Sequence, residues 1–209
     1  MTNENKFHVQ RYSQREVHER VAIERVLDNQ YVAHVGFIDP DTKTPFVIPM
    51  GFARDNNRIL IHGSTGSRIM ISLAKGIDLC VTVTQLNAIV VARSAFNSSM
   101  NYESIMIFGK ARVLNDAEKD VALERITEKL IPGMWSYARA LTKKESAATL
   151  IVELSLDKLS AKARTGEPSD DDEDVSLPIW AGLLPLETKL GAPITATNAA
   201  GIDVPSHLL

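Results

Sequence analysis

The sequence is poor in cysteine and has no long apolar run. Cys80 is the single cysteine among 209 residues, so a disulfide within the chain and a cysteine-rich metal site are both excluded. It lies in the apolar run IDLCVTV, where a small buried side chain is expected. No stretch approaches the roughly 18 apolar residues of a membrane helix, and the start, MTNENKFHVQ, lacks the apolar core of a signal peptide. We therefore expect a reduced, cytoplasmic protein with no membrane partner.

An excess of positive charge is also missing. The net charge is −3 at pH 7, so no basic field attracts nucleic acid or anionic lipid. The Gly-x-Ser-x-Gly motif of hydrolases is absent, and none of the five histidines has the HExxH spacing of zinc enzymes. Neither a serine nucleophile nor a metal site is expected. With 44% apolar and 23% charged residues, the composition is that of a soluble globular protein.

Hydrophobic periodicity predicts more strands than helices. Expected helices are one that follows a Ser13–Glu16 capping box and ends near Asn29, one over 69–75 stopped by Gly76, one over 116–131, and a short one opened by a second capping box, Thr142–Glu145. For the first helix, Val17, Val21, Val26 and Leu27 fall on one face. The expected strands cover 31–38, 45–54, 58–63, 77–85, 88–95, 104–114, 149–156 and 159–164, with β-like sequence again at 175–187.

This pattern favours a mainly β fold, a β-barrel or sandwich with peripheral helices, over a doubly wound sheet. Pro49 cannot donate to a strand ladder and therefore marks an edge or a bulge. The acidic stretch 167–174 is interpreted as a solvated connector. We expect one domain over residues 1–190 and a loose tail over 191–209, which is rich in Ala, Thr, Gly and Pro.

One loop has the residue types of a phosphate site. The segment HGSTGSR (62–68) joins an expected strand to an expected helix. Free backbone N–H groups, small glycines, hydroxyl side chains and the fork of Arg68 would all suit a phosphate. The glycine spacing matches neither GxGxxG nor the P-loop, which argues against ATP and a Rossmann-held dinucleotide. A capped turn with a surface arginine remains the alternative.

A second polar stretch separates two apolar strands. ARSAFNSSMNYESIMIFGKARV (92–113) places many hydrogen-bonding side chains, among them Arg93, Asn97, Asn101 and Tyr102, where a simple hairpin needs only a short turn. A long polar loop is the alternative interpretation.

Several separate motifs together resemble a known family. HGSTGSR, then CVTVT, ARSAFNSSMNYESIMIFGKAR, SAKARTGEP and LPIWAGLLPL occur in the order and spacing of the flavin-nucleotide-binding branch of the pyridoxamine 5′-phosphate oxidase-like family. The likeness extends from about Arg11 to about Leu190, which is nearly the whole chain. It is more specific than any single motif within it.

The resemblance implies an FMN-binding split β-barrel that forms a homodimer and binds FMN at the subunit interface. In that family pattern Ser67 and Arg68 would hold the phosphate, beside His62, Gly63 and Ser64. Two strands would run along the flavin ring, and a C-terminal tryptophan could reach the site from the partner subunit. The further cofactor-binding residues implied in this way are Pro49, Met50, Gly51, Thr82, Val83, Thr84, Met100, Asn101, Tyr102 and Trp180.

Two departures from the family pattern narrow the function. Asn97 and Glu103 stand where relatives have a histidine and a basic residue, so no role is assigned to them. The arginine-rich C-terminal signature of true pyridoxamine phosphate oxidases is absent, which argues against vitamin B6 oxidation.

The function expected from the resemblance is an FMN-dependent oxidoreductase. It would take electrons from NAD(P)H or another donor and pass them to a small molecule such as a quinone or nitro compound. A non-catalytic FMN-binding, storage or sensing protein and a haem-binding split barrel are the alternatives. No catalytic side chain is identified. His34, Tyr102, Lys162, Arg164 and Trp180 are each open to a structural role or a role at the ligand.

Overall fold

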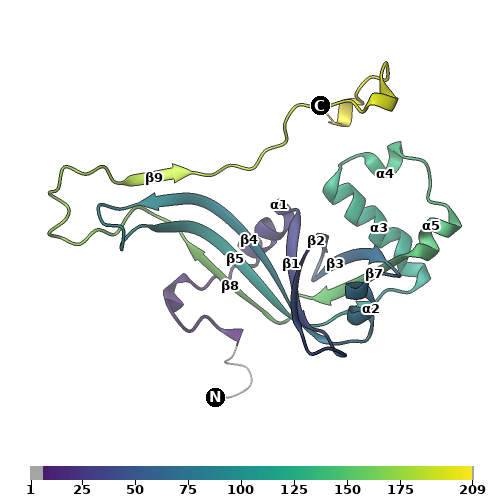
Figure 1. Cartoon of the computed structure of the whole chain (residues 1–209), viewed down its shortest axis with the longest axis horizontal. Helices are drawn as coiled ribbons and strands as arrows, with labels where there is room; N and C mark the ends of the chain where they lie inside the picture. Colours follow the sequence, from purple (N-terminus) through teal and green to yellow (C-terminus); the bar gives the residue numbers. More distant parts are fainter. Residues whose placement is uncertain (1–6, 209) are drawn as a thin grey trace.

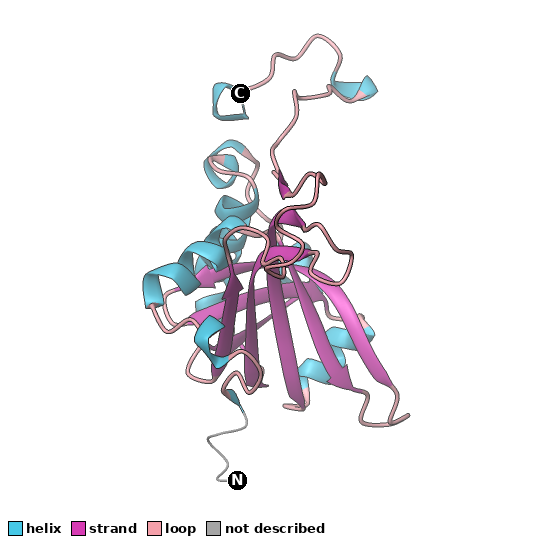
Figure 2. Ribbon diagram, turned by 90° about the vertical axis from the view of Figure 1, so that its left-hand side faces the viewer, coloured by secondary structure: helices cyan, strands magenta, loops and turns pink. Residues whose placement is uncertain are grey.

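The computed structural model describes residues 7–208 (Figure 1). The expected domain over 1–190, the tail over 191–209 and the polar start of the chain therefore extend beyond the described residues, at 1–6 and at 209. Nine strands form one antiparallel sheet, in the order β6-β7-β3-β2-β1-β4-β5-β8, with β9 paired to β4. Mainly β architecture with peripheral helices is thus confirmed, as Figure 2 shows.

The bounds of the elements agree with much of the predicted pattern. The strands are β1 Val32–Ile38, β2 Pro45–Asp55, β3 Arg58–Ser64, β4 Asp78–Val91, β5 Ser99–Lys110, β6 Arg112–Val113, β7 Thr149–Ser155, β8 Leu159–Arg164 and β9 Gly182–Pro185. The helices are α1 Arg20–Asn29, α2 Arg68–Ala74, α3 Asp116–Leu130, α4 Met134–Tyr137 and α5 Lys143–Ala148, with single 3-10 turns at Ser13–Arg15 (η2), Thr197–Ala199 (η3) and Ser206–Leu208 (η4).

The sheet curls into an open barrel because one stretch of chain contributes to both of its ends. β5 pairs with β4, and after a single residue, Ala111, the chain continues as β6, which pairs with β7. Gly109 lies at this bend with φ +158°, and a Cβ there would be 3.0 Å from Leu154 Cδ1. A side chain at position 109 would therefore press on the barrel interior.

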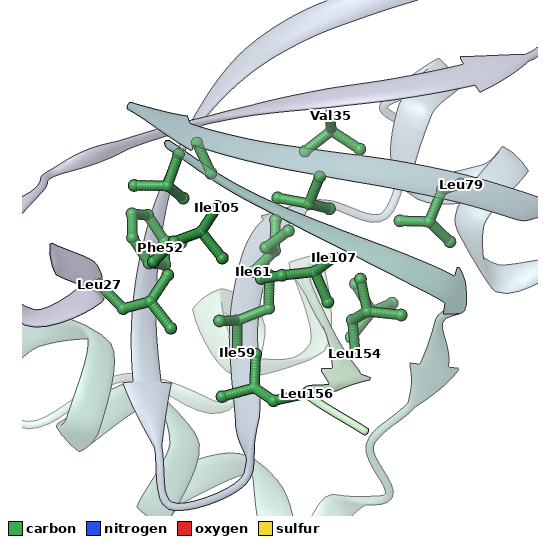
Figure 3. Packing of buried hydrophobic residues seen from close by; sticks show 14 of the residues in the cluster. Leu27, Val35, Phe52, Ile59, Ile61, Leu79, Ile105, Ile107, Leu154 and Leu156 are labelled. Carbon is green, nitrogen blue, oxygen red and sulfur yellow. The ribbon is translucent and has the colours of Figure 1, made fainter. Parts of the chain in front are cut away.

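Two apolar cores lie on opposite faces of the curled sheet. The larger core fills the barrel and includes Leu27 of α1, Phe52 of β2 and Ile107 of β5 (Figure 3). The smaller core lies between α3 and strands β2, β3 and β7, where Leu60 and Ile151 meet Ile126. α3 therefore covers the outside of the barrel only over that part of the sheet.

The outside of the remaining strands is only partly covered: within residues 7–208, the ring of Phe7 lies 4.9 Å from that of Phe108 on β5, and Lys162 of β8 donates to the carbonyl of Arg11. Along β1, β2 and β4, core-facing side chains alternate with exposed or half-buried ones, as expected for a sheet with one buried face. We call the side that faces away from the core, over β2 residues 45–51 and over β1, β4, β5 and β8, the outer face. Its exposed apolar side chains are those of Val32, Ile38, Val47 and Met106.

Pro49 lies where an edge was predicted. At Pro49, β2 pairs with β1 alone, because the pairing of β2 with β3 covers only Phe52 to Asp55. Gly76 ends α2 with φ +69° and donates its N–H to the carbonyl of Leu73, as predicted for a C-terminal glycine. Thr142 and Glu145 form the predicted capping box of α5.

The first predicted helix start was wrong. Ser13 opens a 3-10 turn of three residues, and α1 begins only at Arg20. Glu16 cannot close a capping box there, because its carboxylate accepts from the backbone N–H of Val9 and pairs with His8. The predicted apolar face was also partly wrong: Ile23, Val26 and Leu27 are buried, whereas Val21 is exposed.

Two predicted strands are one continuous strand. β4 runs without interruption through residues 85–88, and a bulge between Leu86 and Ala88 absorbs the polar residues there. β5 begins at Ser99 instead of 104, so the polar segment 99–103 is strand and only 92–98 is loop. Of the β-like stretch 175–187, only Gly182–Pro185 pairs.

None of the described helices is both long enough and apolar enough to cross a membrane.

Candidate functional site

The predicted phosphate loop joins β3 to α2 through a tight turn. The N–H of Ser67 donates to the carbonyl of Ser64 (2.9 Å), and Ser64 Oγ accepts from the N–H of Gly66 (3.2 Å). Ser67 is the N-cap of α2, yet its hydroxyl makes no capping hydrogen bond. Because α2 has only seven residues, the dipole of this helix adds little, and the charge of the site comes from Arg68.

Arg68 projects from the loop toward the end of the β1–β2 hairpin. Its Cζ lies 5.9 Å from the centre of the Phe46 ring, and within residues 7–208 it forms no ion pair. The nearby Asp39 carboxylate is occupied by the turn that it closes, because it accepts from the N–H groups of Asp41 and Thr42. The backbone hydrogen bond from Thr42 lowers the pKa of Asp39 most, and the charge of Arg68 adds to the lowering. The guanidinium thus keeps its donors available for a ligand.

The two loop glycines have different roles. A Cβ at Gly63 would lie 2.7 Å from Met70 Cγ, so this glycine is needed for the packing of α2 against β3. A Cβ at Gly66 would meet only Ser64 Oγ, at 3.8 Å, and the turn there is open. Close approach of a ligand to the backbone, which the sequence suggested at both positions, is therefore supported at Gly66 and not at Gly63.

The second group of predicted residues crosses the outer face in one register row. Pro49 of β2 pairs with His34 of β1, His34 pairs with Thr82 of β4, and Thr82 pairs with Met106 of β5. Thr84, two residues further along β4, is exposed on the same face. Neighbouring strands are about 4.8 Å apart, so the row offers a flat surface that a planar molecule could cover.

Other predicted residues of these strands lie away from this row. Val83 is fully buried in the barrel core, so only its backbone borders the outer face. Met50 packs against the same core, and its Cε lies 3.8 Å from the position of a Cβ on Gly63. Gly51 lies under the end of α3, with Leu130 Cδ1 3.9 Å from the position of its Cβ.

His62 carries an unpaired buried nitrogen. The residue is half-buried on β3, one position beyond the Phe52–Ile61 pair, and its Nδ1 has no hydrogen-bond partner within residues 7–208. Burial lowers the pKa of the ring, so His62 is neutral at neutral pH. A buried polar atom without a partner is costly, and this nitrogen fits a site that a bound molecule completes.

The remaining predicted residues lie at the far end of the β4–β5 hairpin. Met100 is exposed, Tyr102 is half-buried, and Tyr102 pairs with Leu86 and Arg164. Trp180 is exposed, and its ring covers Gly182, where a Cβ would be 2.7 Å from Cζ2.

Asn101 and Arg164 form a polar contact at this end of the hairpin that the sequence did not reveal. Asn101 is buried, donates to the carbonyl of Gly166 (3.0 Å) and accepts from Arg164. Its amide therefore already has partners on both sides within the chain. Arg164 is only 8% exposed and donates also to the carbonyl of Glu167, but in the described part of the chain it has no carboxylate partner. The alternation of Lys162 and Arg164 with alanines left an exposed strand face open, so no signal in the sequence predicted the burial of Arg164.

Within one chain the two groups of predicted residues are far apart. Arg68 lies over Phe46, which is level with Phe37 and Leu79 in the register. Tyr102 is level with Leu86, seven residues further along β4. At about 3.3 Å per residue the two levels are separated by about 23 Å. Along β2, the loop is therefore level with Phe46, which packs against the barrel core three positions from Pro49 of the row, whereas the far end of the hairpin is much more distant.

Comparison with known proteins gives one family and close structural relatives. A family model described as pyridoxamine 5′-phosphate oxidase matches residues 19–163, more than half of the chain. A Mycobacterium smegmatis structure described as an FAD and heme binding protein is 40% identical, with a TM-score of 0.88, and the match covers 92% of this chain and 95% of that one. The flavocytochrome Anf3 from Azotobacter vinelandii is 35% identical, with a TM-score of 0.90 and coverage of 98% and 95%. No curated protein matches.

Proposed function

Because this chain belongs to the pyridoxamine 5′-phosphate oxidase family, we propose that it is a flavoprotein. A flavin nucleotide binds with its phosphate at the loop that includes Ser67 and Arg68. Its ring lies on the outer face over the row that contains Pro49 and Thr82. The family match and the two relatives, an FAD and heme binding protein and a flavocytochrome, support this assignment.

The observation that carries the proposal is the guanidinium of Arg68, which forms no ion pair in the described part of the chain, next to the Ser67 hydroxyl, which makes no capping hydrogen bond. A phosphate accepts several charge-assisted hydrogen bonds from such a pair, and the nearby Asp39 carboxylate is already occupied by the N–H groups of Asp41 and Thr42. The unpaired Nδ1 of His62 is a further donor or acceptor without a partner in the chain. The residues present therefore fit a flavin phosphate and a polar edge of its ring.

The sequence pattern leads to FMN, whereas the M. smegmatis relative is described as an FAD and heme binding protein. Both share the ring and the ribityl phosphate, so loop and row serve either. The identity of 40% over nearly the whole chain favours FAD for this protein. FMN, the cofactor expected from the sequence, becomes the other outcome of the test.

A bound flavin supplies electron or hydride transfer, so the chain needs no nucleophile of its own. Its residues bind the phosphate, orient the ring on the strands and keep a neutral imidazole at His62. We propose an oxidoreductase that takes electrons from NAD(P)H or another small donor and passes them to a small organic acceptor. A protein that only binds the flavin is the alternative.

We further propose that the site is completed by a second copy in a homodimer. The far end of the hairpin, with Tyr102 and Trp180, lies about 23 Å from the level of Arg68 in the same chain. If two outer faces pack about a twofold axis, the far end of one chain lies near the loop of the other. The uncovered apolar side chains of that face, such as Val47, support this arrangement.

Haem is a second candidate ligand, because one relative is described as an FAD and heme binding protein and the other as a flavocytochrome. His62 is half-buried, and burial lowers its pKa, which keeps the neutral form that binds iron.

The test is the identity of what copurifies with the protein. We expect flavin absorption bands, and chromatography of the released cofactor against FAD and FMN standards distinguishes the two. A Soret band identifies haem, and NADPH oxidation with a quinone acceptor tests turnover. Protein that is colourless and stays so after incubation with excess FAD, FMN and haem would contradict the proposal.

A further inference from the structure

The chain beyond β9 leaves the sheet and crosses the molecule. We call residues 188–205 the arm. It begins where the N–H of Leu186 donates to the carbonyl of Asn87 (2.9 Å), next to the pairing of β9 with β4. Figure 1 shows it running from β9 back toward α4, and Figure 2 shows it standing clear of the sheet.

The other end of the arm is also fixed to its own chain. The turn Ser206–Leu208 rests on the corner between α3 and α4, where the His207 and Tyr137 rings are 5.2 Å apart. A Cβ at Gly133, which has φ +80°, would be 2.9 Å from the His207 ring. Both ends of the arm are therefore anchored to its own chain.

Residues 190–198 of the arm are all exposed, whereas Thr188 and Lys189 at its start border a pocket beside Tyr31. The backbone hydrogen bonds of the arm are local, such as that from Ala199 to Ala196. The side chains of Leu190, Ile194 and Ile202 are 84%, 96% and 63% exposed. Ordering a residue costs backbone conformational entropy, and such exposed side chains do little to offset that cost.

The middle of the arm carries no charge, and its two charged residues, Lys189 and Asp203, lie near its ends. Residues 190–202 contain no charged side chain, although 23% of the whole sequence is charged. A neutral, apolar segment needs a neutral, apolar surface. The outer face provides one: its exposed residues on β1 and β2 include Val32, Ile38 and Val47, with no charged residue among the positions 32, 34, 36, 38, 45, 47 and 49.

We propose that the arm closes over a second copy of this chain. A second copy is favoured over an unrelated partner because the same chain carries both unsatisfied surfaces, the arm and the outer face. In a dimer with a twofold axis, the arm of each subunit covers the outer face of the other, so that both arms and both outer faces are buried. The middle of each arm then packs on the outer face of the other subunit, while its two ends stay bound to its own subunit. This inference rests on the homodimer of the proposed function and adds the element that holds the dimer together.

Single substitutions in the full chain test the role of the arm. Ile194→Asp places a charge on a side chain that contacts nothing in its own chain, so folding of the subunit is unaffected. We expect the dissociation constant of the dimer to rise at least tenfold in sedimentation velocity. Val121→Asp, at an exposed apolar position of α3, is the matched control and leaves the constant unchanged.

Hydrogen exchange gives an independent readout of the same proposal. In the wild-type dimer, the amides of residues 190–202 should be protected, and Ile194→Asp should release them. A wild-type monomer, or a dimer whose arm exchanges freely and which tolerates Ile194→Asp like the control, would overturn the proposal. Flavin content is measured on the same samples: a dimer with flavin but a free arm refutes the arm alone, whereas absence of flavin refutes the proposed function.

Discussion

At the scale of single residues, Arg68 provides the positive charge of the candidate flavin site. We expect Arg68→Ala to weaken flavin binding about ten- to a hundredfold, because a hydrogen bond to a charged group contributes about 1.5–3 kcal/mol. The guanidinium is exposed in the free chain, so larger losses are not expected. Equilibrium dialysis measures the change. Arg125→Ala, at an exposed position of α3, is the matched control. Equal flavin affinity in the two variants would remove Arg68 from the site.

The buried ring of His62 makes stability depend on pH. Burial lowers the pKa of His62 in the folded protein. In the unfolded chain, the pKa of a histidine ring is about 6.5. The free energy of unfolding therefore has its full value above about pH 6.5 and falls as the pH drops below it. We expect His62→Asn to flatten this fall, as measured by urea titration at several pH values between about 5 and 7. An unchanged slope would contradict the burial of a neutral imidazole.

At the scale of elements, the acidic loop is tied to the tip of the β4–β5 hairpin. The sequence suggested a solvated connector, but Asp170 accepts from the N–H (2.6 Å) and the guanidinium (2.7 Å) of Arg93. Its side chain is almost buried, and Asn97 reaches the neighbouring Asp171. The loop therefore helps to order the segment before Tyr102.

We expect Asp170→Asn to loosen this loop and to lower the free energy of unfolding by about 1–3 kcal/mol, the usual cost of a lost charged hydrogen bond. Limited proteolysis should then cut within residues 165–180 faster than in the wild type. Asp172→Asn changes an exposed carboxylate of the same loop and should leave both measurements as they are. If the two variants behave alike, Asp170 does not hold the loop.

At the scale of the whole molecule, subunit association and flavin binding should be lost together. Val47→Glu puts a charge on the outer face, where Val47 is exposed and pairs with Gly36. We expect a monomer by light scattering and release of flavin on dialysis, because each site would lack the residues of the partner. An unchanged thermal unfolding signal of the barrel core serves as the control for folding. A flavin-loaded monomer would place the whole site within one chain.

The sequence by itself determined the features that depend on neighbouring residues. The capping box of Thr142 and Glu145, the stop at Gly76 and most strands follow from periods and turn chemistry within a few positions. The loop with Ser67 and Arg68 was predicted from the same kind of local pattern, and its role as a phosphate site stays a prediction. Family membership, now shown by the match to residues 19–163, was carried by several such local motifs in order.

Only the tertiary structure decided what depends on distant contacts. The carboxylate of Glu16 pairs with His8 and accepts from the N–H of Val9, so it does not cap a helix. Gly63 is required because Met70 packs against it. The register of β4 placed Tyr102 about 23 Å from the level of Arg68, which no spacing in the sequence reveals. Such outcomes are set by packing between segments far apart in the chain, and local residue patterns carry no record of that packing.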